Sequence, residues 1–134
     1  MKIEGVQPEQ FPDVYPHILW AFESFAGRDP DGSSPEDIAG QVLSQTSQCW
    51  VAFDDEIKAV ALSEVRDGRA KSVLVTHCAG RDRQTWQEPL VEEIRNWARS
   101  IGATRFGTVN RPGWTPFLRK MGLQETHRLM EQEL

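Results

Sequence analysis

Residues 114–125, WTPFLRKMGLQE, contain the pattern that decides the fold. The segment TPFLRKM predicts a short helix, and Gly122 ends it because glycine readily takes the left-handed conformation that closes a helix. The following residues, LQETHRLMEQEL at 123–134, mix polar and apolar side chains and predict a final strand. A strand therefore follows directly on a short helix that ends in Lys-Met-Gly-Leu.

Before this segment, the chain predicts a helix and a strand. Four apolar residues between 86 and 101 recur on one face of a helix, and Gly102 follows its end. The next stretch, TRFGTV at 104–109, predicts a strand. The four apolar helix residues are Leu90, Ile94, Trp97 and Ile101.

Three successive strands precede that helix. They are CWVAFDD at 49–55, IKAVALSEVRDG at 57–68 and AKSVLVTHCAG at 70–80. All three are rich in valine and alanine, and turn residues separate them. Asp54-Asp55 and Asp67-Gly68 suit tight hairpin turns. The three strands therefore predict an antiparallel meander.

The first third of the chain predicts a short strand and two helices. The strand covers 2–6 and the first helix covers about 8–26, with the loop GRDPDGSS after it. In the second helix, within SSPEDIAGQVLSQ at 33–45, Ser34 suits the N-cap, Pro35 the first turn and Asp37 a capping box. We expect the buried face of this helix to consist of Ile38, Val42 and Leu43.

The element order is therefore β-α-α-β-β-β-α-β-α-β. A hairpin meander followed by a crossover helix implies a mixed sheet covered by helices, which is an α/β (α+β) fold. A chain of 134 residues without repeats or long linkers suits one domain over 1–134.

Composition excludes several classes of function. The net charge of −5 disfavours both nucleic-acid binding and docking on an anionic membrane. No apolar run is long enough for a membrane span, and the first residues lack a signal-peptide core. Cys49 and Cys78 are too few for a disulfide framework and too far apart for a zinc motif. We expect a cytoplasmic protein in which Cys49 is a buried free thiol.

The element order and the closing segment resemble the GNAT N-acetyltransferase superfamily. The motif residues are Val109-Asn110 at a strand end, and Phe117-Leu118-Arg119-Lys120-Met121-Gly122-Leu123 across the short helix. The resemblance covers residues 48–134 well and the first 47 by element order. It implies a mixed, mostly antiparallel sheet of six to seven strands flanked by helices.

The resemblance also implies a site for acetyl-CoA. In that family the molecule lies where the fourth and fifth strands splay apart, which would place it against Val75 and Asn110 here. A Gln/Arg-X-X-Gly-X-Gly/Ala loop holds the pyrophosphate at the start of the third helix, where helix amides attract an anion. The corresponding segment is Arg81-Asp82-Arg83-Gln84-Thr85-Trp86. The expected cofactor-binding residues in this loop are Arg81, Arg83, Gln84 and Thr85.

This loop departs from the family pattern. Gln84 and Trp86 stand where the two small residues of the motif belong. Thr85 and Glu88 suit a capping box, which would occupy helix amides that a phosphate needs. Trp86 is large enough to fill space that a cofactor would otherwise occupy.

Candidate catalytic residues are few. Family enzymes commonly carry a general-acid tyrosine four residues before the glycine, and that position is Leu118 here. The candidate general bases are Glu64 and His77, both in the strand meander. Cys78 is next to His77, but adjacent strand residues point to opposite faces, which disfavours a dyad. The spacing of the three histidines favours no metal site.

Three functions remain open from the sequence. One is an N-acetyltransferase that uses acetyl-CoA and an amine acceptor. The second is a non-catalytic GNAT-fold binding or structural module with a protein partner; short chains of this kind resemble phage- or prophage-encoded proteins, including virion and assembly proteins. The third is an enzyme of another class built on His77 and Cys78. Edge strands of this fold can pair, so we also expect that a homodimer can form.

Overall fold

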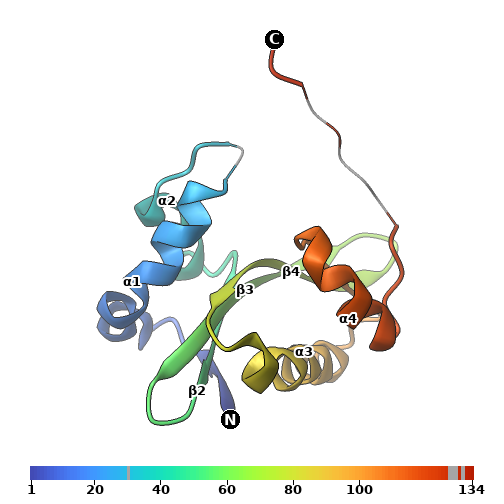
Figure 1. Cartoon of the computed structure of the whole chain (residues 1–134), viewed down its shortest axis with the longest axis horizontal. Coiled ribbons are helices and arrows are strands. Elements are labelled where there is room, and N and C mark those ends of the chain that lie inside the picture. Colours follow the sequence, from blue (N-terminus) through green and yellow to red (C-terminus); the bar gives the residue numbers. More distant parts are fainter. Residues whose placement is uncertain (30, 127–129, 131) are drawn as a thin grey trace.

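The protein is an α/β domain built on one five-stranded sheet, seen here in a computed structural model (Figure 1). The structure describes residues 1–29, 31–126, 130 and 132–134. The strands lie in chain order, β1 (Lys2–Val6), β2 (Gln48–Phe53), β3 (Ile57–Asp67), β4 (Lys71–Gly80) and β5 (Arg105–Thr108). The first four are antiparallel, and β5 pairs with β4 in parallel.

Helices cover both faces of the sheet (Figure 1). One face is covered by α1 (Phe11–Gly27) and α2 (Pro35–Leu43), and the other by α3 (Arg83–Ser100) and the short α4 (Thr115–Lys120). Helix α3 is the crossover between β4 and β5, which a parallel pair requires.

Each helical layer has its own apolar core because the strand side chains alternate between the faces. Along β3, Val60 and Leu62 pack against α1 and α2, whereas Ala59 and Ala61 pack against α3. The small alanines leave room on the α3 side for indole rings, including Trp50 and Trp86. Trp50 Nε1 donates to the buried Ser63 hydroxyl at 2.9 Å, which satisfies the polar atom of that ring.

The α1 face shows which local expectations hold. The capping box of α2 is confirmed, since the Ser34 hydroxyl accepts from Asp37 N and the Asp37 carboxylate accepts from Ser34 N. Cys49 is confirmed as a buried free thiol, and burial raises its pKa to about 12. The expected burial of Leu43 is wrong: it is 52% exposed at the end of α2, and Ala39 takes its place in the core.

Two further boundaries differ from expectation. Among the described residues the sheet has five strands rather than six or seven, because residues 123–126 after α4 form no strand. Part of the predicted final strand, with His127, lies outside the described residues. Helix α3 begins at Arg83, earlier than the apolar repeat alone suggested.

No helix in the described ranges is long and apolar enough to cross a membrane.

The close packing at the end of β4 generates a prediction. A Cβ added at Gly80 would lie 2.7 Å from both the Ala59 Cβ and the Lys58 carbonyl oxygen, and 2.8 Å from Trp86 Cζ2. We expect Gly80→Ala to lower the free energy of unfolding by about 1–3 kcal/mol through overpacking. Chemical denaturation measures this loss.

Gly40→Ala is the matched control, because nothing lies within 4 Å of its added Cβ inside α2. That substitution should stabilise the protein by about 0.5–1 kcal/mol through helix propensity. Equal effects of the two substitutions would contradict the packing described for Gly80.

Candidate active site

A cavity lies where β4 and β5 separate. The last backbone hydrogen bond between these two segments runs from Val109 N to the Val75 carbonyl at 2.9 Å. Beyond it β4 continues to Gly80 beside β3 alone, so one edge of β4 has no strand partner among the described residues. The cavity measures about 270 Å³ and connects the two faces of the sheet. Its α3 side is apolar, with Leu90, Val91, Ile94 and Trp114.

A β-bulge in β4 sets which side chains enter this cavity. Leu62 of β3 pairs with His77 and Ser63 pairs with Val75, so Thr76 is an extra residue. Val75 and Cys78 both pack on the α3 side, and His77 therefore points to the α1 side. Without the bulge, alternation would place His77 on the same face as Val75.

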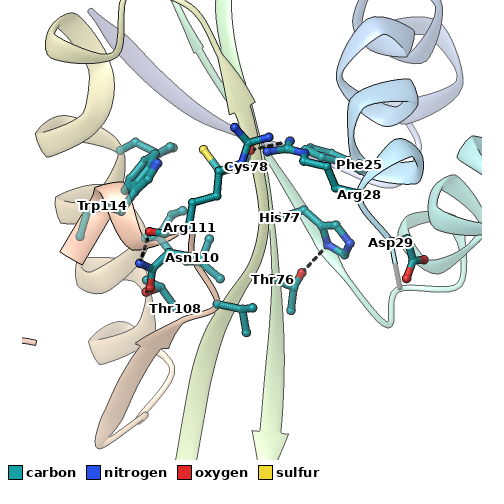
Figure 2. A pocket seen from close by; sticks show the side chains of 15 residues that line it. Phe25, Arg28, Asp29, Thr76, His77, Cys78, Thr108, Asn110, Arg111 and Trp114 are labelled. Atoms are coloured by element: carbon teal, nitrogen blue, oxygen red, sulfur yellow. Dashed lines mark hydrogen bonds between the residues drawn. The ribbon is translucent and has the colours of Figure 1, made fainter. Parts of the chain in front are cut away.

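His77 contacts Phe25 of α1 and its neighbour Thr76 of β4 (Figure 2). Its ring centroid lies 5.1 Å from that of Phe25, and its Nδ1 lies 2.8 Å from the Thr76 hydroxyl. The Thr76 hydroxyl donates to the Leu62 carbonyl, so its oxygen is free to accept from Nδ1–H. In that tautomer Nε2 carries the lone pair that a general base needs.

Burial lowers the pKa of His77 below its ordinary value of 6.5. Arg28 lowers this pKa further, and the carboxylates of Asp29 and Glu64 raise it. Desolvation is the largest cause, so the neutral imidazole is favoured at pH 7. The side chain can then accept a proton without first losing one.

Cys78 lines the same cavity but has a different chemistry. Desolvation raises the pKa of its thiol to about 12, with Arg28 acting in the opposite direction. At pH 7 the sulfur is therefore a thiol and a poor nucleophile. The two residues also face opposite sides of the sheet, as expected, which disfavours chemistry based on a Cys78–His77 dyad.

Two arginines and one carboxylate provide the formal charges of the cavity wall. Arg28 follows α1, and its guanidinium donates to the Ser24 carbonyl, the Ser24 hydroxyl and the Cys78 carbonyl, at 2.9–3.2 Å. Arg111 follows β5 and has no hydrogen bond or ion pair from its guanidinium to any described residue. The Asp29 carboxylate accepts from the backbone N–H groups of Asp31 and Ser33, which stabilises the loop after α1.

The N-terminus of α3 lies close to the apolar side of the cavity. Asp82 precedes the helix in the left-handed conformation, with φ 56°, and no side chain caps the first-turn amides. The predicted Thr85–Glu88 capping box is wrong, because the helix starts at Arg83 and the Thr85 hydroxyl donates to the Asp82 carbonyl. The Thr85 N–H donates to the Asp82 carbonyl, but the amides of Arg83 and Gln84 have no side-chain cap, and beside Arg81 they suit an anionic group.

Trp86 packs beside this helix end without entering the cavity. It is 2% exposed, its Nε1 donates to the Arg81 carbonyl, and its ring lies over Gly80 and against Trp114. Trp114 forms the cavity wall, with the Arg83 guanidinium 5.8 Å from its ring centroid. The opening between β4 and β5 is therefore not filled by Trp86. Its ring instead fills the space beneath the loop at Arg81 and Asp82 that precedes α3.

The structure brings together some of the residues predicted from the sequence. Val75, His77 and Asn110 line the cavity, and the Asn110 amide bridges the Thr108 hydroxyl and the Arg111 carbonyl. Arg81, Arg83, Gln84 and Thr85 lie at the helix end, where the Arg81 side chain is 65% exposed and near Glu56. Glu64 does not line the cavity; its carboxylate pairs with Arg66 at 3.3 Å.

Sequence reasoning missed Arg28 and Arg111. They lie 83 positions apart in the sequence, each in a loop where an arginine is ordinarily solvated. Only the fold shows that α1 ends opposite the β5–α4 connection. No short sequence motif could have indicated that these two arginines lie in the same cavity.

Among the described residues, no group of His, Cys, Asp and Glu side chains is arranged to hold a metal.

Comparison with known proteins identifies the fold. No model of a protein family matches the chain, and no curated protein does. A solved structure of a probable acetyltransferase superposes with a TM-score of 0.73 at 16% identity, covering 100% of this chain and 97% of the other. The chain thus has the fold of GNAT acetyltransferases.

Two further structures carry informative ligands. A predicted acetyltransferase from Clostridium acetobutylicum, solved with acetyl-CoA, gives a TM-score of 0.72 at 14% identity, covering 98% of this chain and 95% of the other. An aminoglycoside acetyltransferase from an uncultured soil metagenomic sample, solved with sisomicin, gives 0.71 at 14%, covering 99% and 95%.

The burial of Trp86 generates a prediction about stability. Trp86→Ala should lower the free energy of unfolding by about 3–5 kcal/mol, because it leaves a cavity over Gly80 and removes the hydrogen bond to Arg81. Urea denaturation measures the change. Trp20→Ala serves as the control, since Trp20 is 39% exposed and should cost about 1 kcal/mol or less. A similarly small cost for both would contradict the burial of Trp86.

The lowered pKa of His77 generates a prediction about pH. The unfolded chain takes up the imidazole proton near pH 6.5, whereas the folded protein does so at lower pH. The contribution of the neutral His77 is therefore full above pH 6.5 and is lost as pH falls from there toward the folded pKa. Unfolding free energies between pH 7.5 and 5 should fall less steeply in His77→Gln. Parallel curves would show that this pKa is not lowered.

Proposed function

We propose that this protein is an N-acetyltransferase that transfers an acetyl group from acetyl-CoA to a small amine. The observation that carries the proposal is the open cavity between β4 and β5, which joins an apolar wall to a neutral histidine. The fold shared with acetyltransferases, one of them solved with acetyl-CoA, supports this choice of reaction.

The residues around the cavity fit acetyl-CoA. The apolar wall of Leu90, Ile94 and Trp114 suits an extended, largely apolar arm. The uncapped amides of α3, together with Arg81 and Arg83, suit phosphates. Asp82 lies in the same loop, and its carboxylate pairs with Lys58 at 3.4 Å, which reduces its repulsion of an anion.

When bound, acetyl-CoA supplies a thioester whose carbonyl carbon an amine can attack, forming the amide bond as the C–S bond breaks. Backbone N–H groups on the unpaired edge of β4 can donate to the carbonyl oxygen, which is where negative charge develops. His77 Nε2 accepts the proton that the amine loses. The thiolate leaves with the electron pair of the C–S bond and takes a proton from water.

His77 is the proposed general base, and the other candidate is less suitable. His77 lines the cavity in its neutral form, whereas Glu64 lies outside it and pairs with Arg66. The position expected for a general-acid tyrosine is Leu118, which is buried. Tyr15, the chain's one tyrosine, packs with Phe11 and Phe22 in the α1 core. Solvent therefore replaces the tyrosine as the proton source in this proposal.

A second candidate is a binding module of the same fold that does not use acetyl-CoA. Trp86 supports it, because its ring fills the space beneath the loop in which the family has small residues. A virion or assembly role, which the resemblance to phage-encoded chains suggests, would be one form of this candidate.

Isothermal titration calorimetry with acetyl-CoA and CoA distinguishes the two candidates. The enzyme proposal expects dissociation constants in the micromolar range and product formation in a screen of small amines. In that assay His77→Gln should lower kcat by about 10²–10⁴-fold, the usual contribution of a general base. His17→Gln is the matched control, since His17 is exposed on α1 and should leave kcat unchanged.

Absence of binding by folded protein at millimolar acetyl-CoA would overturn the enzyme proposal and favour the module. Binding with full activity in His77→Gln would keep the reaction but remove His77 as its base.

A further inference from the structure

Two guanidinium groups meet at one end of the cavity, beside Cys78 (Figure 2). Arg28 comes from the end of α1 and Arg111 from the segment after β5, on opposite sides of the splay. The hydrogen bonds to Ser24 and Cys78 use Nε and one terminal nitrogen of Arg28. Its second terminal nitrogen, like the whole Arg111 guanidinium, has no hydrogen bond to the described residues.

These two positive charges lack a countercharge in the cavity wall. Asp29 is the sole carboxylate among the residues that line the cavity, and its oxygens already accept backbone N–H groups. Partial desolvation and the charge of Arg111 both lower the pKa of Arg28, although both arginines are exposed residues. With His77 neutral, the cavity wall is cationic within a protein whose net charge is −5.

A small anion would relieve this repulsion. A carboxylate suits the site best, because the planar guanidinium matches its two oxygens. The phosphates of acetyl-CoA have a separate site available at the N-terminus of α3, on the other face of the sheet. Arg28 follows α1 and bonds the Cys78 carbonyl, on the face where His77 would meet the attacking amine, and Arg111 lines the same cavity.

We infer that Arg28 and Arg111 bind the carboxylate of the acceptor, so that the acceptor is a small amino acid-like molecule carrying both an amine and a carboxylate. This inference rests on the proposed acetyl transfer and specifies its substrate class. The carboxylate held by the arginine pair would place the amine near His77, whose Nε2 takes the proton as the new C–N bond forms.

The size and charge of the cavity support a small acceptor of this kind. Its volume of about 270 Å³ lies just below the roughly 300–1,000 Å³ that is usual for drug-sized ligands. A polycationic acceptor such as an aminoglycoside would place further positive charge beside Arg28 and Arg111, which is unfavourable. This chain therefore differs in acceptor class from the sisomicin-bound structure with which it shares its fold.

The test begins with binding in the absence of acetyl-CoA. The standard amino acids are screened by protein-observed NMR, and each one that binds is compared with its α-amide, which has the same side chain and amine but no α-carboxylate. The inference expects the acid to bind at least tenfold more tightly than the amide. Arg111→Gln should remove that preference, and Arg28→Lys should reduce it, because lysine keeps the charge but not the planar fork.

Arg99→Gln is the control, because Arg99 is exposed on α3 and bonds only Asn96 among the described side chains. It should retain the preference of the unmodified protein for the acid. Titration of Arg111→Gln with acetyl-CoA then identifies the source of the anion. Unchanged affinity supports the acceptor carboxylate, whereas a tenfold loss would assign the arginines to a cofactor phosphate and overturn the inference.

The outcomes also separate this inference from the proposed function. Equal binding of acids and amides, or no binding of either, would overturn the carboxylate site even if acetyl-CoA binds and amines are acetylated. Binding of acids that depends on Arg111, in a protein that does not bind acetyl-CoA, would keep the carboxylate site and overturn the acetyl transfer.

Discussion

The separation of β5 from β4 after the Val109–Val75 hydrogen bond is the constraint on which the site depends. A strand in the middle of a sheet has both backbone edges paired, and such edges offer nothing to a ligand. Strand β5 has only four residues, so β4 extends beyond it with one edge unpaired. Helices α1 and α3 cover the two faces of the opening, which makes it a cavity rather than an exposed edge.

The bulge at Thr76 adds the polar chemistry to this opening. One extra residue in β4 moves His77 to the α1 face while Cys78 and Val75 share the α3 face. The apolar wall and the proton acceptor therefore lie on opposite faces of a single strand. The Thr76 hydroxyl, placed at the bulge, also contacts His77 Nδ1 and links it to the Leu62 carbonyl. A local irregularity thus sets the face, and contributes to the tautomer, of the proposed base.

The sequence predicts the layers of this fold better than its site. Regular patterns such as the Leu90–Ile94 repeat and the Ser34–Asp37 capping box depend on neighbours in the chain, and the structure confirms them. The bulge at Thr76 leaves no trace in composition. Alternation alone would therefore place His77 on the same face as Val75, whereas the structure places it on the α1 face. The apolar repeat also does not indicate that α3 starts at Arg83, because the first turn carries exposed polar residues.

The loop before α3 shows how a degenerate motif can keep a usable conformation. The family pattern places small residues there, which permit tight turns and close approach of the backbone. In this chain Asp82 makes the left-handed turn, a conformation that aspartate tolerates better than most residues. Lys58 pairs with its carboxylate, and the Asp82 carbonyl accepts both the N–H and the hydroxyl of Thr85. The turn is therefore stabilised by side chains, and the amides of Arg83 and Gln84 stay without a side-chain cap although the glycines are absent.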